Sequence, residues 1–395
     1  MVFEYRSVYS LKKICLFAAH FYPHLGGIET YTLQLAKKMI LSNYEVIVVT
    51  SNIDDSPEYE LYQGIKVYRF PVLKFINGRL PFPKFNMSFL KILKKIKAEN
   101  SDYYILNARF YIHSIIGSLI AKREKKPVIL IEHGTGHFTL NNKLLDLFGH
   151  IYEHTITFFL KRLVKEFYGV SYACNKWLQH FGITAIDVLY NGIDVNYQIK
   201  SHKNYRDFLH IDNDEVVITY AGRLIKEKGI ISLVDTFNKL CAKHNNISLV
   251  IAGDGPLHSE VIKMKTEKIS LLGRMEHDEV LKLMTTSDIF VLTTNFPEGL
   301  PTSILEAALY QCAILASPRG GTPEVVIDDS YGILINPLDN DAIYRGLDIL
   351  ISDKKNRVML SKNVREKVLA EFDWSVTATN LINNLQRIDK LDKYV

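Results

Sequence analysis

The stretch from Asp288 to Ala316 reads DIFVLTTNFPEGLPTSILEAALYQCAILA. Asp288–Thr294 is a short, mostly apolar run, which is typical of a strand buried on both faces. A turn follows over Asn295–Pro301, and the proline near its end fits the first turn of a helix that runs to about Gln311. Because Ala313–Ala316 is again short and apolar, the stretch predicts one strand-helix-strand unit of a parallel sheet.

The same alternation recurs along most of the 395 residues. Short apolar runs predict strands at Ile14–Ala19, Glu45–Thr50, Gly64–Phe70, Tyr103–Leu106, Pro127–Ile131, Gly169–Tyr172, Val188–Tyr190, Val216–Ala221, Ile247–Ala252 and Ile269–Leu272. Helical periodicity predicts helices at Thr30–Ile40, Lys143–Glu166 and Gly229–His244, and further helices end the chain. Apolar strands between amphipathic helices indicate parallel sheets that are covered on both faces.

The pattern stops at Asn191–Asp194, and the polar, turn-rich residues 196–213 are interpreted as a linker. The length also suits two domains rather than one core. We therefore expect an α/β protein with two doubly wound, Rossmann-like domains, 1–195 and 196–374, facing across a cleft. A C-terminal helix at about 375–395 is expected to pack back on the first domain. Ligands of such sheets bind at the carboxyl ends of the strands.

The composition is that of a soluble globular protein, with 47% hydrophobic and 23% charged residues. No apolar run approaches the roughly 18 residues of a membrane span, and the first apolar run lacks a cleavage site of small residues. Four widely separated cysteines suit a reducing compartment. These features predict a cytoplasmic protein, either free or peripheral on the inner membrane face.

The net charge of +5 is unevenly distributed, because the first 195 residues are basic and the rest are slightly acidic. Basic runs occur at Lys91–Lys97, Lys122–Lys126 and Leu160–Lys165. They are either solvated helix faces or a surface for anionic lipid, to which each basic residue contributes roughly 1 kcal/mol. Nucleic acid is not expected as a partner, because the runs carry no recognisable reading motif.

Glu298 and Glu306 lie in the turn and helix of the opening stretch. Carboxylates are rarely buried without a partner, and Gly299 between them would let a ligand approach the backbone. The amino end of the following helix favours an anion. The alternative is structural: Ser303 and Glu306 fit a capping box, which requires no ligand.

Two other strand-to-helix turns carry candidate ligand-binding residues. Ala221–Gly229 contains Arg223 and Lys228, whose side chains suit phosphate oxygens, although a solvated basic loop would have the same composition. Gly26 and Gly27 form the first such turn of the chain and permit close backbone approach. They do not form the G-x-G-x-x-G pattern, so a dinucleotide site is poorly supported.

Taken together, these motifs resemble the retaining glycosyltransferases of the GT-B fold, family 4, also called glycosyl transferases group 1. The resemblance covers nearly the whole chain. It rests on Gly26-Gly27-Ile28-Glu29, His133 in Glu-His-Gly, Asn191-Gly-Ile-Asp194, Arg223 with Lys228-Gly229, Ala252-Gly-Asp-Gly-Pro256, and Glu298-Gly-Leu-Pro with Glu306. The last pair matches the family's pattern of two glutamates separated by seven residues, which is the most specific part.

The resemblance implies a role for each candidate in the second half of the chain. Glu306 would bind the ribose hydroxyls of a nucleotide-sugar, and Glu298 would contact hydroxyls of the donor sugar. Arg223 and Lys228 would bind the diphosphate. Backbone atoms of Gly299, Leu300 and Pro301 would lie near the sugar and phosphate, although Pro301 has no N–H to donate. Gly253 is expected in a strand-end turn whose backbone lines the base pocket.

For the first half, the resemblance implies that Gly26 and Gly27 let this half close over the donor. His133 would lie beside the reacting carbon, as a catalytic residue with Glu298, Arg223 and Lys228. Asn191 and Asp194 are interpreted as hinge and linker residues.

The resemblance also implies retention of anomeric configuration and no requirement for a metal or other cofactor. The adjacent pairs Asp54-Asp55 and Asp328-Asp329 are not the D-x-D motif that holds a divalent ion in many transferases. Fixed cations would replace that ion at the departing diphosphate.

The expected reaction is sugar transfer from a UDP- or GDP-sugar to a saccharide or lipid-linked acceptor, in cell-envelope, capsule or exopolysaccharide synthesis. The first half would bind the acceptor, with Tyr68–Phe89 and His133–His154 as candidate segments. Two alternatives stay open: a sugar-nucleotide 2-epimerase of the same fold, and a non-catalytic nucleotide-sugar-binding subunit. Product analysis separates them, because an epimerase first yields a new sugar nucleotide and a binding subunit yields no product.

Overall fold

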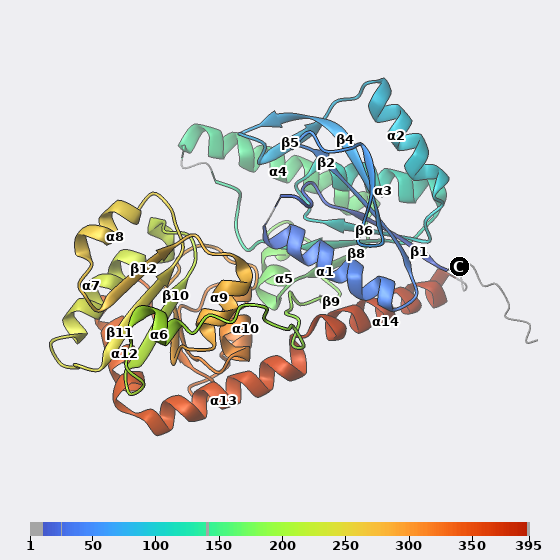
Figure 1. Cartoon of the computed structure of the whole chain (residues 1–395). Helices are drawn as coiled ribbons and strands as arrows, with labels where there is room; N and C mark the ends of the chain where they lie inside the picture. The colour runs from blue at the N-terminus through green and yellow to red at the C-terminus, as the bar shows by residue number, and fades with distance from the viewer. Residues whose placement is uncertain (1–10, 25, 140–141, 393–395) are drawn as a thin grey trace, which may run out of the picture. The chain divides into compact units, whose positions relative to one another are not determined.

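A computed structural model describes residues 11–24, 26–139 and 142–392. The chain forms two compact units. Unit 1 comprises the residues up to Leu189 and those from Trp374 onward, and unit 2 is Tyr190–Asp373. Both are built from strands that alternate with helices (Figure 1). The α/β class expected from the sequence is confirmed.

Within the described residues, unit 1 contains a nine-stranded sheet. Its strands are β1 (Lys13–Phe17), β2 (Glu45–Asn52), β3 (Tyr59–Tyr62), β4 (Ile65–Phe75), β5 (Leu80–Pro83), β6 (Tyr103–Asn107), β7 (Val128–Glu132), β8 (Glu166–Gly169) and β9 (Asp187–Val188). The order is β3-β4-β2-β1-β6-β7-β8-β9, with β5 paired to β4, and all pairs are parallel except β3 with β4 and β4 with β5. The helices are α1 (Gly27–Leu41), α2 (Met87–Ala98), α3 (Ile112–Glu124), α4 (Lys143–Leu163), α5 (Tyr172–Gln179) and α14 (Trp374–Asp392).

Both faces of this sheet are buried. Along β1, Ile14 and Leu16 join the apolar cluster that α1 and α14 cover, and Cys15 and Phe17 join the cluster under α2, α3 and α4. This burial explains why the strands read as continuous apolar runs. Helix α14 is held to unit 1 by Trp374, whose ring lies edge-on to Tyr31 with centroids 5.2 Å apart.

Unit 2 has a six-stranded sheet within the described residues, in the order β12-β11-β10-β13-β14-β15, and all its pairs are parallel. Its strands are β10 (Val216–Ala221), β11 (Ile247–Ala252), β12 (Ile269–Gly273), β13 (Ile289–Leu292), β14 (Ala313–Ala316) and β15 (Ile333–Leu334). Its helices are α6 (Tyr205–Leu209), the 3-10 turn η1 (Lys226–Lys228), α7 (Ile230–Leu240), α8 (His258–Met264), α9 (His277–Met284), α10 (Thr302–Leu309), α11 (Thr322–Val325), α12 (Asn340–Ser352) and α13 (Lys354–Glu371).

The strand order of unit 2 is that of a Rossmann sheet, with two strands (β11 and β12) on one side of β10 and three (β13, β14 and β15) on the other. The direction of winding therefore reverses between β10 and β13. Ligands of doubly wound sheets bind at the carboxyl ends of the strands at this reversal point.

The structure differs from the sequence-based expectation at the end of α4. The predicted helix Lys143–Glu166 ends at Leu163, and the strand predicted at Gly169–Tyr172 lies at Glu166–Gly169 instead. The strand ends at Gly169 because helix α5 begins directly after it. Ser171 is the N-cap of α5, and its Oγ accepts from the N–H of Cys174 at 3.2 Å. The short strands β3, β5 and β15 were not predicted.

The first segment of unit 1 ends at Leu189, whereas the sequence suggested a domain boundary at residue 195. Residues 190–195 belong to unit 2 because Ile193 N donates to Phe372 O at 2.9 Å, and the ring of Tyr190 packs on Phe372. The predicted linker 196–213 is also part of unit 2. The N–H groups of Lys200 and Ser201 donate to Asp278, and α6 lies within this segment.

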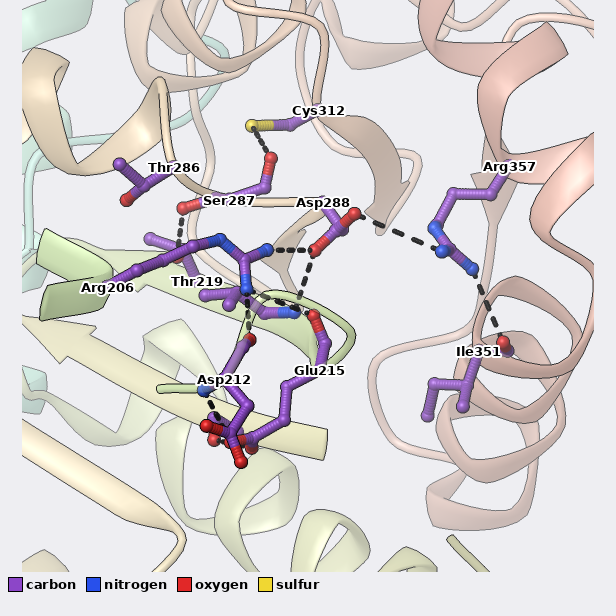
Figure 2. Close-up of polar contacts among 12 residues, drawn as sticks. Arg206, Asp212, Glu215, Thr219, Thr286, Ser287, Asp288, Cys312, Ile351 and Arg357 are labelled. Atoms are coloured by element: carbon purple, nitrogen blue, oxygen red, sulfur yellow. Dashed lines mark hydrogen bonds and ion pairs between the residues drawn. The ribbon is translucent and has the colours of Figure 1, made fainter. Parts of the chain in front are cut away.

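A polar network joins elements at the amino-terminal edge of the unit 2 sheet (Figure 2). Asp288 Oδ2, just before β13, accepts from Arg206 Nη2 and from Val217 N, both at 2.9 Å. Arg206 also donates to the carbonyls of Asp212 and Glu215, at 2.9 and 3.2 Å. One carboxylate therefore connects α6, β10 and β13, and fixes the pairing of the two strands at the reversal point.

No helix among residues 11–24, 26–139 and 142–392 is both long enough and apolar enough to cross a membrane.

Replacing Asp288 by Ala should lower the free energy of unfolding by about 1–3 kcal/mol, because it leaves Arg206 and the Val217 N–H without their shared acceptor. Urea denaturation measures this. Asp235→Ala removes only an exposed pair with Lys239 on α7 and should leave the midpoint unchanged. Equal effects of the two substitutions would contradict a special role of Asp288.

Candidate functional site

The candidate site of unit 2 lies at the carboxyl ends of β10 and β13. These strands pair in parallel, with Ile218 opposite Ile289 and Thr219 opposite Phe290. The turns that follow them therefore lie side by side. Asn295 N donates to Glu227 O at 2.6 Å, and Thr294 Oγ1 donates to the same carbonyl at 3.3 Å. The fold thus brings together the basic turn that contains Lys228 and the acidic turn that contains Glu298, which are 70 residues apart in the sequence.

Lys228 and Glu298 form an ion pair between these two turns. Both side chains are mostly buried, with 15% and 16% of their surface exposed. The Lys228 ammonium also lies 5.8 Å from the centroid of the Phe296 ring. The pair presents a cation and a carboxylate at the edge of the sheet, which suits a ligand with both phosphate and hydroxyl groups.

Arg223 lies in the same turn as Lys228, and its side chain is exposed. Its carbonyl accepts from the hydroxyl of buried Tyr220 at 2.9 Å, so the backbone of the turn is fixed. The predicted pair of cations is therefore present in one turn, with one member paired to Glu298 and the other directed to the surface.

Glu306 lies in α10, and its environment argues against the capping box. The helix begins at Thr302 with Pro301 as its N-cap, and no side chain caps it. Glu306 Oε1 instead lies 2.7 Å from Nε2 of His277, at the start of α9. This contact raises the pKa of His277. Sequence reasoning missed His277, because α9 is distant in the chain and a single histidine gives no pattern.

The loop from Glu298 to Pro301 is held by backbone contacts that the sequence did not indicate. Gly321 N donates to Gly299 O at 2.7 Å. Gly320 has φ +55°, and a Cβ there would lie 2.0 Å from Glu298 O, so only glycine fits this approach. Arg319 Nη2 also donates to Asn295 Oδ1. The turn after β14 therefore holds the Glu298–Pro301 loop in place.

Gly253, the predicted base-pocket residue, makes a similar approach beside β10. Its φ is +149°, and a Cβ would lie 1.9 Å from Gly222 O. Its N–H donates to Gly273 O at 2.7 Å. The structure therefore places Gly253 in the turn after β11, next to the turn that carries Arg223.

Leu300 is buried, and its carbonyl accepts from Asn191 Nδ2 at 3.1 Å. Asn191, interpreted from sequence as a hinge residue, thus contacts the candidate-site loop directly. Asp194 accepts from Asn196 N at 3.2 Å.

In unit 1, Gly26 and Gly27 lie where α1 begins after β1. Gly26 is the N-cap of the helix, and its carbonyl accepts from Thr30 N at 3.0 Å. Glu29 in the first helical turn is buried, and burial raises the pKa of its carboxyl group. The Glu29 carboxyl group lies against Gly26, and a Cβ at Gly26 would come within 2.3 Å of Glu29 Oε2.

His133 follows β7, and its ring is fixed on two sides. Nε2 lies 2.9 Å from Asn107 Oδ1, and the ring lies edge-on to Tyr31 with centroids 4.7 Å apart. Burial of the ring lowers the pKa of His133 to about 3. The imidazole is therefore neutral near pH 7, so it can donate or accept a hydrogen bond but does not supply a positive charge.

Comparison with known proteins gives the same assignment for both units. Residues 201–367 match the family described as glycosyl transferases group 1, and residues 25–197 match glycosyltransferase family 4. The uncharacterized glycosyltransferase MJ1069 of Methanocaldococcus jannaschii is 26% identical over 374 residues, which cover 92% of this chain and 95% of that protein. The phosphatidylinositol N-acetylglucosaminyltransferase gpi3 subunit of Schizosaccharomyces pombe is 27% identical over 401 residues, covering 95% and 82%.

Solved structures agree in fold. HepE of Anabaena in complex with UDP superposes with a TM-score of 0.73 at 18% identity, over 95% of this chain and all of that one. Sucrose-phosphate synthase of Thermosynechococcus elongatus gives 0.76 at 18% identity, over 96% of this chain and all of that one. The chain therefore belongs to the group 1 glycosyltransferases and has the GT-B type of fold. Its general activity is that of a glycosyltransferase.

Proposed function

We propose that this protein is a retaining, metal-independent glycosyltransferase that moves a sugar from a nucleoside diphosphate sugar to a lipid-linked acceptor. The observation that carries the proposal is the Lys228–Glu298 pair at the reversal point of the unit 2 sheet, with Glu306 in the helix that follows. In such a donor, Lys228 would contact the diphosphate, Glu298 the sugar and Glu306 the ribose.

The diphosphate would be bound by Lys228 and Arg223. As the bond between the anomeric carbon and the diphosphate oxygen breaks, negative charge builds up on that oxygen, and fixed cations stabilise it. The acceptor hydroxyl oxygen forms the new bond on the same face, and its proton passes to the departing phosphate oxygen. Lys228 exchanges part of its contact with Glu298 for the phosphate, which leaves the Glu298 carboxylate to accept from sugar hydroxyls.

Glu306 would accept from both ribose hydroxyls. His277 already lies at one of its carboxylate oxygens, so it fixes the carboxylate in one orientation. The backbone N–H groups of Gly299 and Leu300 are candidates for the sugar and phosphate, and Gly253 for the base. In unit 1, Gly26 and Gly27 are proposed donor contacts, and the neutral His133 is proposed as a hydrogen-bonding group for the sugar.

UDP is the first expectation for the donor nucleotide. HepE has been solved with UDP and with UDP-glucose, and it shares the fold of this chain. GDP stays the alternative, because both nucleotides offer the same ribose and diphosphate to Glu306, Arg223 and Lys228.

A lipid-linked acceptor is supported by an apolar cavity of about 290 Å³ in unit 1. Its walls come from the β4–β5 hairpin, the segment after β6, the segment after β7 and α4; they are Ile76, Leu80, Phe110, Phe138, Leu145, Phe148, Gly149, Tyr152 and Glu153. These residues fall mostly in the two segments that the sequence indicated for the acceptor. Such a lining favours an acyl or prenyl chain over a free sugar.

Helix α4, which lines this cavity, also exposes apolar side chains and ends in basic residues. Large apolar side chains of α4 are exposed at Leu144, Leu147, Phe148, Ile151, Phe158 and Phe159. Lys161 and Arg162 lie in the last turn of the same helix. This combination suits contact with an anionic membrane. A lipid-linked saccharide at the inner membrane face, in cell-envelope polysaccharide assembly, is therefore the proposed acceptor.

The donor proposal is tested by direct binding of UDP, GDP and ADP to the purified protein without metal. One of UDP and GDP should bind, and Arg223→Ala should weaken it by 10-fold or more, because a charged hydrogen bond contributes about 1.5–3 kcal/mol. Arg223 is exposed, so the variant should fold normally. Failure of all three nucleotides to bind the folded protein would overturn the proposal.

Glu306→Gln should weaken nucleotide binding by 10-fold or more and change the melting temperature little, because the residue does not cap α10. Calorimetric titration and thermal melting measure the two effects. Glu366→Gln on α13, an exposed carboxylate of unit 2, is the matched control and should change neither. A large loss of stability with unaltered affinity would show that Glu306 is structural.

Membrane contact is tested by sedimentation with anionic vesicles at low salt. The wild type should bind and be released as the ionic strength rises. Phe159→Ser removes an exposed apolar side chain from α4 and should reduce binding several-fold. Leu338→Ser, at an even more exposed apolar residue of unit 2, should not. A wild type that ignores the vesicles, or equal losses in both variants, would contradict this part of the proposal.

A further inference from the structure

We propose that unit 1 contains a binding site for a divalent transition metal, formed by His137, His154 and His180, and that Zn²⁺ is the ion that fits it best. One ring nitrogen from each residue lies within 4.8 Å of the other two. Three imidazoles with an open fourth position are a common donor set for Zn²⁺. The sequence did not indicate this site, because its residues are spread over more than 40 positions without a fixed spacing.

The three side chains come from three different elements. His137 lies between β7 and α4, His154 lies on α4, and His180 is the C-cap of α5. The ring centroids are 5.8 Å apart for His137 and His154, and 5.2 Å apart for each of the other two pairs. Three nitrogens bound to one tetrahedral Zn²⁺ would be about 3.4 Å apart, given Zn–N bonds of about 2.0–2.1 Å. Small rotations of the exposed His154 and His180 side chains would close that gap.

Two of the rings are already oriented. His137 Nδ1 lies 2.7 Å from Oε2 of buried Glu153, whose other oxygen accepts from Phe138 N at 2.8 Å. A carboxylate on one ring nitrogen fixes the tautomer and leaves the other nitrogen, Nε2, for a metal. His180 is stacked on Trp177, with the centroids 4.9 Å apart and 3° between the ring planes.

The buried positive charge near the cluster is paired with carboxyl groups. Beneath the histidines, the guanidinium of Arg109 is matched by two carboxyl groups, Glu132 at 3.1 Å and Glu153 at 3.3 Å. Arg109 therefore does not leave an unbalanced positive charge near the site.

His150 is not one of the three residues whose nitrogens lie within 4.8 Å of one another, but a side-chain rotation would bring it toward the fourth position. It precedes His154 by four residues on α4, so both lie on one face of the helix. Its ring centroid is 4.0 Å from that of His137. The ion would thus have either a fourth imidazole or a water molecule.

A bound ion would link the segment after β7, α4 and α5. It would also fix one wall of the apolar cavity, because Glu153 both contacts His137 and lines that cavity. The site shares no residue with the proposed donor site, and its occupancy is separate from the metal-independent transfer step. The inference therefore does not depend on the proposed function, and each can be tested without the other.

The test is calorimetric titration of Zn²⁺ into the full chain, prepared without a histidine tag and freed of metal by a chelator that is then removed. We expect one Zn²⁺ per chain, and an affinity loss of about 100-fold or more in His154→Ala and in His180→Ala. Both positions are exposed, so these variants should fold. His24→Ala is the matched control, because His24 belongs to the other histidine cluster of the described residues, with His20 and Glu29.

Two further readouts locate the ion. Zn²⁺ should raise the melting temperature of the wild type and not that of His154→Ala. Anomalous diffraction at the zinc edge should show a peak about 2.0–2.1 Å from the ring nitrogens of His137, His154 and His180. The proposal is overturned if Zn²⁺ does not bind the folded protein, if His154→Ala binds as tightly as the wild type, or if the peak lies at His24.

Discussion

The close backbone approach of neighbouring turns at the carboxyl edge of the unit 2 sheet is the constraint on which the candidate site depends. The pairing of β10 with β13 brings Lys228 to Glu298. Glycines at 253 and 320 then let the adjacent turns pack backbone to backbone, at distances that a Cβ would forbid. Because these contacts involve main-chain atoms, the fold itself sets the backbone positions from which the charged side chains extend.

The sequence predicted those parts of the fold and site that short, local patterns encode. Apolar runs marked the central strands, and the spacing of Glu298 and Glu306 marked one strand-to-helix turn. What the patterns could not show were contacts between distant segments. His277 reaches Glu306 from another helix, and Asn191 reaches Leu300 over 109 positions. Edge strands such as β15 were missed because two residues make no recognisable run.

Glu153 in unit 1, like Asp288 in unit 2, is a carboxylate that joins several segments of the chain. Its carboxylate accepts from the Phe138 N–H and contacts Arg109 and His137. A buried carboxylate with this many partners is stable only while all of them stay in place. The apolar cavity, which Glu153 also lines, therefore shares this side chain with the histidine cluster. A shift of His137 would move Glu153 and change the cavity wall.

The charges of the two units imply a division of chemical tasks. The exposed Arg223 and the paired Lys228 place the cations suited to a departing diphosphate in unit 2. The candidate residue of unit 1, His133, has a pKa of about 3 and is neutral at physiological pH, because its ring is buried. A neutral imidazole is compatible with the positive charge that develops at a sugar carbon during transfer, where an imidazolium would oppose it. The low exposure of the His133 ring would therefore suit the role proposed for it.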